Sequence, residues 1–209
     1  RHTLALKVNG TVVCWGWDSD GQSTVPGSLD DATQVTGGDR HSAALRSDGS
    51  VLCWGSNSYG QSNAPVLSDA VQVAAGNNHT LALRADGTVA AWGRNDMGQC
   101  DVPVDLGTVV ELAAGGDHVL ALLDDGTVAA WGRNNRGQCD IPEGLADVIV
   151  VAAGNLHSLA LLSDGSVICW GNEEYDLSQP PISANGALDL DAGFYHSIQL
   201  TQNTGACCF

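Results

Sequence analysis

Basic residues are scarce in this sequence of 209 residues. Lysine and arginine together number 8, against 24 aspartate and glutamate residues, which gives a formal net charge of −16 at pH 7. A surface of this sign repels phosphate backbones and anionic lipid headgroups. We therefore expect no nucleic-acid partner and no docking on an anionic membrane surface.

Long apolar runs are also missing. No stretch reaches the roughly 20 apolar residues that a membrane-spanning helix needs, so we expect no direct membrane insertion. Hydrophobic residues nevertheless make up 44% of the chain, which is enough for a substantial core at this length. The first residue is Arg1 and not methionine. We expect the sequence to be a mature or trimmed piece of a longer chain.

Cysteine spacings typical of metal or redox sites are absent. None of the seven cysteines forms a C-x-x-C pair, so neither a zinc site nor a redox motif is indicated. The stretch WDSDGQ at 17–22 contains part of a calcium loop, but the bidentate glutamate expected downstream is missing. The acidic residues at 173, 174 and 176 are better explained by a solvated patch than by a cation site. We therefore expect no metal and no cofactor, and the disulfide state of Cys207 and Cys208 stays open.

What the sequence does contain is a repeat with a period of about 39 residues. The ten residues DGTVAAWGRN at 86–95 recur letter for letter at 125–134. The same period relates the histidines at 2, 41, 79, 118, 157 and 196. It also relates the Trp-Gly pairs that begin at 15, 54, 92, 131 and 170. A fixed period of this length is typical of propellers and other repeat folds.

One period predicts short antiparallel strands. Residues 71–75, VQVAA, end at a glycine, residues 79–83, HTLAL, alternate, and residues 88–92, TVAAW, return. Between the last two, Asp86-Gly87 predicts a tight type I′ hairpin turn. A weaker extended segment around 100–103 predicts a fourth strand. No helical period is present, and glycine recurs too often for helices.

Small sheets in series predict an all-β fold, a β-propeller of about 39-residue, four-stranded blades with five repeats visible. A single such sheet cannot bury both faces, so sheets pack face to face around an axis. The residue before each Trp-Gly tryptophan is small, which predicts a crowded site between sheets. These residues are Cys14, Cys53, Ala91, Ala130 and Cys169.

The repeat resembles that of the regulator-of-chromosome-condensation family. The shared pattern is V-x-V-A-A-G-x-x-H-(T/S)-L-A-L-x-x-D-G-(T/S)-V-x-x-W-G-x-N-x-x-G-Q, from His2 to about Leu200. The resemblance implies a propeller, usually of seven blades, so we expect a part of a seven-bladed ring, with a five-bladed ring as the alternative. We assign 1–200 to the repeats and 201–209 to a C-terminal tail without strand pattern. The last unit departs from the pattern, with Asp176-Leu177 in place of Gly-Gln.

Antiparallel alternation places the loop after A-A-G and the loop after W-G at the same end of each sheet. These loops are the least regular positions of the repeat, and variable loops on a rigid scaffold often bind partners. Their aromatic, methionine and arginine residues are types enriched in interface cores, although tolerant loop tips are the alternative explanation. The predicted partner-binding residues are Trp17, Arg40, Tyr59, Met97, Arg136, Tyr175, Phe194 and Tyr195.

The repeated histidines and tryptophans are predicted to be structural. Equivalent positions in successive blades are spread around a ring, so the histidines do not gather into a metal or catalytic site. We expect each histidine to bond a nearby group inside its own blade. The residues assigned this role are His41, His79, His118, His157, Trp54, Trp92, Trp131 and Trp170.

Three functions follow from these observations, and an enzyme is not among them because no catalytic arrangement is visible. The first is a non-catalytic protein–protein interaction module or scaffold. Its partner is unidentified. The partner could belong to a large multi-subunit complex, in which this chain would be an acidic accessory subunit. Alternatively, the partner could be an enzyme, which this chain would cap as a secreted inhibitor. The second, implied by the resemblance, is guanine-nucleotide exchange on a small GTPase. The third, ultraviolet sensing, lacks the dense tryptophan cluster it requires, because Trp17 alone lies outside the Trp-Gly series.

Overall fold

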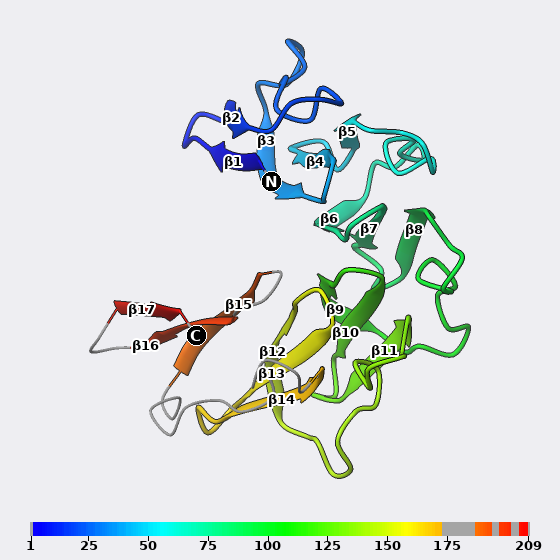
Figure 1. The fold of residues 1–209 in the computed structure, drawn as a ribbon, viewed down its shortest axis with the longest axis vertical. Helices are drawn as coiled ribbons and strands as arrows, with labels where there is room; N and C mark the ends of the chain where they lie inside the picture. Colours follow the sequence, from blue (N-terminus) through cyan, green and yellow to red (C-terminus); the bar gives the residue numbers. More distant parts are fainter. Residues whose placement is uncertain (1, 173–186, 194–196, 202–204, 209) are drawn as a thin grey trace. The chain divides into compact units, whose positions relative to one another are not determined.

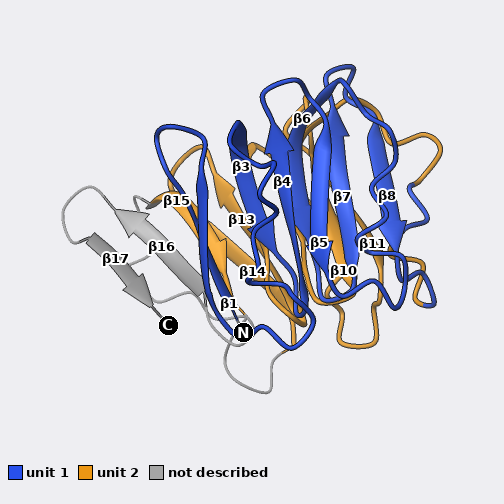
Figure 2. Ribbon diagram, turned by 90° about the horizontal axis from the view of Figure 1, so that it is seen from above, with its two compact units in different colours: residues 1–96, 100–102 blue, residues 97–99, 103–209 orange. Residues whose placement is uncertain are grey.

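The computed structural model describes residues 2–172, 187–193, 197–201 and 205–208, and every regular element in these ranges is a β-strand (Figure 1). The chain divides into two compact units (Figure 2). Unit 1 holds residues 1–96 and 100–102, and unit 2 holds residues 97–99 and 103–209. None of the described residues forms a helix long and apolar enough to cross a membrane.

Unit 1 contains one two-stranded and two three-stranded antiparallel sheets. The first sheet pairs β1 (His2–Leu6) with β2 (Val12–Gly16). The second has the order β3 (Ala32–Gly37), β4 (His41–Arg46), β5 (Val51–Gly55). The third has the order β6 (Ala70–Ala75), β7 (His79–Arg84), β8 (Val89–Gly93).

Unit 2 contains three three-stranded antiparallel sheets among its described residues. The first comprises β9 (Val109–Ala114), β10 (His118–Leu123) and β11 (Val128–Gly132). The second comprises β12 (Val148–Ala153), β13 (His157–Leu162) and β14 (Val167–Gly171). The third comprises β15 (Ala187–Ala192), β16 (Ser197–Thr201) and β17 (Gly205–Cys208).

The three predicted strands of each period are present, but the fourth is not. Residues 100–103 form no strand, and the backbone N–H of Val102 bonds the nearby carbonyl of Cys100 instead of a neighbouring strand. Pro103 has no backbone N–H to contribute to a ladder. Five of the six sheets among the described residues therefore have three strands where four were expected, and the first sheet has two.

The hairpin turns also differ from the prediction. Gly87 N–H bonds the carbonyl of Arg84, and Arg84 N–H bonds the carbonyl of Thr88. Gly87 has a φ of 80°, whereas Asp86 is not among the residues with positive φ. A type I′ turn needs positive φ at both positions, so this loop is a type I turn followed by a glycine bulge. The aspartate has another role: its Oδ1 accepts bonds from the N–H and hydroxyl of Thr88 at 3.0 and 2.6 Å.

The C-terminal segment 201–209, which continues no strand pattern in the sequence, nevertheless contributes a strand to the last sheet. Gly205–Cys208 forms β17 and pairs with β16 in antiparallel register, with Gln199 opposite Cys207. The last sheet is thereby completed by residues that lack the Trp-Gly sequence of the other third strands. Backbone pairing needs no particular side chain, so the repeat motif could not reveal it.

The core lies between successive sheets within each unit. In unit 1, Val12 of the first sheet packs with Ala44 and Trp54 of the second, and Cys14 contacts this cluster. In unit 2, Cys169 contacts a cluster that includes Leu159 and Leu190 from neighbouring sheets. The prediction that small residues before the tryptophan face a crowded site between sheets is thereby confirmed at these two positions. Burial raises the pKa of the Cys169 thiol to about 12, so it is an unreactive core residue.

The glutamine of each Gly-Gln pair joins one sheet to the next through its backbone carbonyl. The carbonyl of Gln22 accepts bonds from the Ser42 hydroxyl and from Trp54 Nε1, both at 2.9 Å. The carbonyl of Gln61 likewise accepts two bonds, from the Thr80 hydroxyl and from Trp92 Nε1, at 3.0 Å each. In unit 2, Gln138 is bonded by Ser158 at 2.8 Å and Trp170 at 3.0 Å. Val119 holds the hydroxyl position of sheet β9–β11, and Gln99 there is bonded by Trp131 alone among the described residues.

His2, His41 and His118 bond the following sheet, not their own as was expected, whereas both ring nitrogens of His79 lack a hydrogen-bond partner among the described residues. His41 Nε2 lies 2.9 Å from Thr80 Oγ1, and His118 Nε2 lies 3.0 Å from Ser158 Oγ. Each hydroxyl donates its proton to a glutamine carbonyl, so the imidazole must donate Nε2–H to the hydroxyl oxygen. An imidazole in this tautomer cannot act as a base toward the same hydroxyl. The pairs therefore resemble a nucleophile and its base only in distance.

Glycine before the histidine loop is required by close approach. A Cβ built on Gly38 would meet Cε1 and Nδ1 of the His41 imidazole and the carbonyl oxygen of Gly76. The glycine of the A-A-G-x-x-H motif is therefore needed because the histidine imidazole packs directly against its backbone. We propose that the histidines and tryptophans of the repeat are structural, as the buried side chains of His41, His79, Trp54 and Trp131 support.

We predict that Thr80→Val lowers the free energy of unfolding by about 1–3 kcal/mol, because it leaves His41 Nε2 and one lone pair of the Gln61 carbonyl without a hydroxyl partner. Thr80→Ser, which keeps the hydroxyl, is the matched control and should cost about 1 kcal/mol or less. Urea unfolding followed by fluorescence measures both. Equal losses in the two variants would contradict the proposed hydroxyl bridge.

We also predict that the protein loses stability below neutral pH. Burial lowers the pKa of His41 and His79 from 6.5 to about 4. Between these values the unfolded chain binds protons that the folded chain excludes, so stability is full above pH 6.5 and falls as the pH drops toward 4. Each histidine contributes roughly 1.4 kcal/mol per pH unit in this window.

The measurement is the urea unfolding free energy at pH 7, 6 and 5. His41→Asn should be less stable at pH 7 but should lose less stability between pH 6 and pH 5 than the unchanged protein. A stability that is constant from pH 7 to pH 5 would show that the histidines are not buried in the neutral form.

Candidate partner-binding rim

Two loops of each sheet meet at the same end. In the second sheet, Gly37 pairs with Ser42 and His41 pairs with Gly55, so the loops that follow Gly37 and Gly55 are neighbours. A backbone bond of 2.9 Å from Ser56 N–H to the Arg40 carbonyl joins them. We call these loops the rim of each unit. In unit 1 the rim comprises residues 17–21, 38–40, 56–60, 77–78 and 94–96, and in unit 2 it comprises residues 97–98, 116–117, 133–137 and 155–156.

The backbone of each W-G loop is fixed by side chains of the loop itself. Asn57 Oδ1 accepts a bond from Ser62 N–H at 3.1 Å, and Gln61 Oε1 accepts one from Tyr59 N–H at 2.8 Å. The equivalent pair in the next loop is Asn95 with Cys100 N–H at 2.8 Å. The second loop residue was counted among the variable positions, yet every described loop has Asp or Asn there because its side chain closes the turn.

Asp18 lies in the stretch that resembles part of a calcium loop, and its side chain also accepts hydrogen bonds from its own loop. Its carboxylate accepts bonds from Ser23 N–H at 2.7 Å and from the Thr24 hydroxyl at 2.8 Å. The Thr24 hydroxyl is the main reason that the pKa of Asp18 lies below its ordinary value. Among the described residues, no group of three or more His, Cys, Asp or Glu side chains could hold a metal ion. Asp18 thus serves the loop itself.

In unit 1 the rim exposes two of the predicted aromatic residues. The residues Trp17 and Tyr59 are 52% and 53% exposed, respectively. The guanidinium of Arg94 lies 5.4 Å from the centre of the Tyr59 ring and forms an ion pair of 2.6 Å with Asp96. This contact orders the ring while leaving it accessible.

Arg40, also predicted, projects from the neighbouring loop of unit 1. Its side chain is 50% exposed and lies 3.7 Å from Asp39 and 3.9 Å from Asp20. Ion pairs that are exposed to this degree contribute little to stability, so they position the guanidinium and do not bury it.

In unit 2 the rim exposes Met97 and Arg136. Met97 is 44% exposed, and its N–H bonds Gln99 Oε1 at 2.9 Å. Arg136 is exposed, and its N–H bonds Gln138 Oε1 at 2.8 Å.

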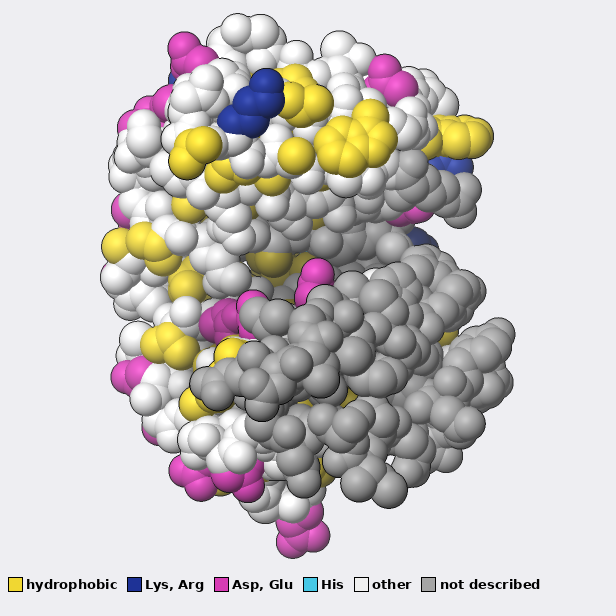
Figure 3. Space-filling model, turned by 90° about the vertical axis from the view of Figure 1, so that its left-hand side faces the viewer, with side chains coloured by type: hydrophobic (Ala, Val, Ile, Leu, Met, Phe, Trp, Pro, Cys, Tyr) yellow, Lys and Arg dark blue, Asp and Glu magenta, His cyan; other side chains and the backbone are white. Residues whose placement is uncertain are grey.

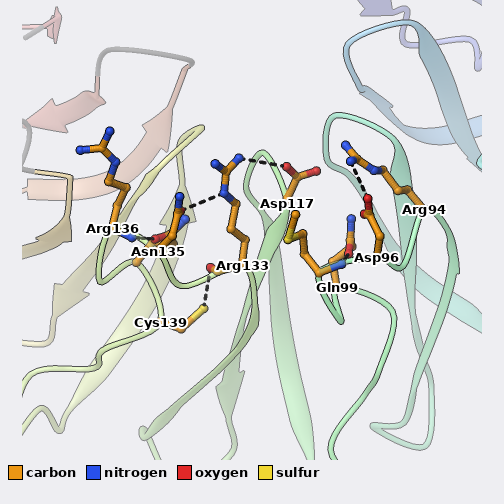
Figure 4. A network of polar contacts seen from close by, with 10 residues as sticks. Arg94, Asp96, Gln99, Asp117, Arg133, Asn135, Arg136 and Cys139 are labelled. Atoms are coloured by element: carbon orange, nitrogen blue, oxygen red, sulfur yellow. Dashed lines mark hydrogen bonds and ion pairs between the residues drawn. The ribbon is translucent and has the colours of Figure 1, made fainter.

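Two arginines of the rim were not predicted. One of them is Arg94, described above. The other is Arg133, whose guanidinium lies 3.5 Å from the buried carboxylate of Asp117 and donates to Asn135 Oδ1 at 2.8 Å (Figure 4). Both arginines occupy the repeat position that holds Trp17 in the first loop. Aligning the loops position by position would have found them. The predicted Tyr175, Phe194 and Tyr195 lie outside the described residues.

Several solved structures are similar in fold to this chain. The ectodomain of the Physcomitrella patens receptor kinase CR4 matches with a TM-score of 0.83 and 26% identity, over 100% of this chain and 60% of that one. The CRINKLY WD40 ectodomain of the Arabidopsis thaliana receptor kinase ACR4 matches with a TM-score of 0.78 and 25% identity, over 100% and 77%. The chain thus spans less than two thirds of the first of these.

Prp20p from Saccharomyces cerevisiae, described with its binding to Gsp1p and histones, has a TM-score of 0.79 and 23% identity, over 100% of this chain and 69% of that one. This level of identity shows the fold alone. A comparison with curated proteins gives no match. The predicted all-β propeller fold is confirmed, while the seven-bladed ring and the 1–200 boundary stay predictions.

The family assignment depends on the repeat itself. The family model described as the regulator of chromosome condensation (RCC1) repeat matches five times, at residues 1–22, 32–61, 70–99, 109–138 and 148–176. These matches cover more than half of the sequence and contain the Trp-Gly and histidine positions whose contacts join the sheets. The chain belongs to the RCC1 repeat family.

Proposed function

We propose that this chain is a non-catalytic binding module that holds a protein partner with its rim. The observation that carries the proposal is the contrast between fixed backbone and variable side chains in the W-G loops. Tyr59, Met97 and Arg136 stand at one repeat position, and each has its N–H bonded to a glutamine side chain. The same backbone site thus displays three chemically different side chains.

Such loops lose little conformational entropy on binding because their backbones are already ordered. Preorganisation of this kind increases affinity without adding contacts. Aromatic, methionine and arginine side chains are the ones that contribute most to interface cores. Four of the eight basic residues of this acidic chain lie on the rim, at Arg40, Arg94, Arg133 and Arg136.

A partner in a large assembly would suit this arrangement. The net charge of −16 disfavours phosphate backbones as ligands, whereas the mixed charges of the rim suit a polar protein surface. We propose the role of an accessory subunit or scaffold, and the secreted enzyme inhibitor is the variant in which the partner is an enzyme. Nucleotide exchange on a small GTPase is the alternative from a different class.

We predict that Trp17→Ala combined with Tyr59→Ala weakens partner binding by about 30-fold or more, because truncation of a hot-spot residue typically costs about 2 kcal/mol. The protein is immobilised and exposed to an extract of its source cells, and retained proteins are compared between variants. The affinity is then measured with the purified partner.

The matched control is Val8→Ala combined with Val66→Ala. These two valines are fully exposed, and Val8 lies in a hairpin turn at the opposite end of its sheet. The control should retain the partner at full affinity. Retention by the rim variant, or equal loss by both variants, would contradict the assignment of the rim.

For the exchange function, release of a fluorescent guanine nucleotide from small GTPases is the measurement. We expect the addition of this chain to leave the release rate unchanged, because nothing in the described rim identifies a GTPase as its partner. Acceleration that depends on Tyr59 and Trp17 would favour nucleotide exchange over the scaffold role.

A further inference from the structure

The first strand of every three-stranded sheet among the described residues contains a β-bulge near its beginning. In unit 2 the extra residue is Val110 in β9, Ile149 in β12 and Leu188 in β15. A bulge leaves its extra residue unpaired and changes the direction of its side chain. The three side chains are 51%, 50% and 50% exposed, whereas the residues before the first two, Val109 and Val148, are 3% and 4% exposed. Each bulge therefore turns a large apolar side chain away from the core.

These three exposed side chains belong to neighbouring strands. Strand β12 contacts both β9 and β15, and Glu111 Oε2 accepts a bond of 3.1 Å from Val151 N–H, which joins β9 to β12. The three side chains hold the same position in their strands, close to the end where each strand begins. The rim lies at the other end, because these strands run toward the loops that precede the histidine strands. A row of exposed apolar side chains is typical of an interaction surface.

Carboxylates flank this apolar row. Asp124 N–H bonds the carbonyl of Thr108 at 3.0 Å, so Asp124 lies beside the beginning of β9. The carbonyl of Asp147, which lies two residues before Ile149, accepts a bond of 2.9 Å from Ser163 N–H. Both aspartates are exposed. We call this group the turn-end surface, which comprises Val110, Asp124, Asp147, Ile149 and Leu188.

Unit 1 neutralises the equivalent aspartate, whereas unit 2 does not. Asp31 precedes β3 and forms an ion pair of 2.8 Å with Arg46 at the end of β4. Asp147 precedes β12 in the same way, but Leu162 holds the arginine position at the end of β13. The only basic residues after residue 96 lie on the rim, at Arg133 and Arg136. In the lower half of Figure 3, acidic and hydrophobic side chains are visible, and none of the described side chains there is dark blue. The turn-end surface is therefore both apolar and negatively charged.

We propose that the turn-end surface docks a basic protein segment that carries both cationic and apolar side chains. The cationic side chains pair with Asp124 and Asp147, and the apolar side chains pack on Val110, Ile149 and Leu188. Charge complementarity of this kind selects a partner and steers its approach. The surface lies at the end of the sheets opposite the rim, so the chain is able to hold two partners at once.

Other occupants lack this combination of chemistry. Nucleic acids and anionic lipid headgroups would place negative charge against Asp124 and Asp147. A second copy of the chain docked through the same surface would bring the aspartates of the two copies together, with no basic residue of this surface to separate them. A cationic and apolar segment satisfies both the carboxylates and the apolar row.

The probe is a fluorescein-labelled peptide in which lysine and leucine alternate, KLKLKLK, and its Kd for the full chain is measured by fluorescence anisotropy. We expect Asp124→Asn combined with Asp147→Asn to raise the Kd by about 5-fold or more, since each exposed ion pair contributes modestly. Asparagine tolerates the φ of 57° at Asp147, so this variant keeps its backbone. Val110→Ser combined with Ile149→Ser should raise the Kd by about 10-fold or more, because apolar contact area is lost. Urea unfolding shows that each variant is folded.

The matched charge control is Asp101→Asn combined with Asp140→Asn, which changes the net charge by the same amount. Each of these carboxylates accepts a bond from an asparagine of its own W-G loop, and an asparagine oxygen can accept that bond as well. This control should bind KLKLKLK as the unchanged chain does, and so should the rim variant Trp17→Ala combined with Tyr59→Ala. The peptides ELELELE and KSKSKSK should bind about 10-fold more weakly or worse.

Equal weakening by the two aspartate variants, or equal affinity for KSKSKSK and KLKLKLK, would show a general attraction of cations to an acidic protein and would overturn the proposal. Loss of binding in the rim variant alone would assign the peptide to the rim and overturn it as well. Slower amide hydrogen exchange of segment 147–151 on addition of KLKLKLK, absent in the Asp124→Asn and Asp147→Asn variant, would support the turn-end surface.

Discussion

The glutamine carbonyl of each Gly-Gln pair is the group on which the association of the sheets depends. It lies at the end of a loop from one sheet and accepts the tryptophan indole N–H of the next, together with a hydroxyl at Gln22, Gln61 and Gln138 but not at Gln99. Because both donors and the acceptor are buried, loss of any one would leave a polar group without a partner. The period of 39 residues is the distance along the chain from one such carbonyl to the next.

This constraint also explains why the rim is suited to recognition. The loop that delivers the carbonyl must have a fixed backbone, and its Asn or Asp and Gln side chains fix it from within. The residues at the other loop positions differ from one repeat to the next, as Tyr59, Met97 and Arg136 do at one position whose backbone is held in the same way. Different side chains are therefore displayed on one repeated loop backbone.

Much of the fold could be predicted because the same short sequence motifs recur in five repeats. The strands, the hairpins, the small residue before Trp170 and the end of the sheet on which the variable loops lie all followed from periodicity and strand direction. Two local predictions failed for local reasons. The Asp86-Gly87 turn uses positive φ at one residue and not two, and the segment around 100–103 was too weakly patterned to distinguish a strand from a loop. The predicted rim stays a prediction, and Arg94 and Arg133 were left out of it although they share the repeat position of Trp17, because the loops were not aligned position by position.

The sequence by itself determined the repeat, its family, the all-β class and the sidedness of the loops, because each is set by residues close together in the chain. Only the tertiary structure decided which sheet each histidine serves. His41 bonds Thr80, which is a full repeat away, and the tautomer it adopts is fixed by a third residue, Gln61. Contacts between sheets depend on how backbones stack in space, and no local pattern encodes that distance. The exposed Trp15 follows the same rule, since its sequence is that of a buried tryptophan and its surroundings alone distinguish it.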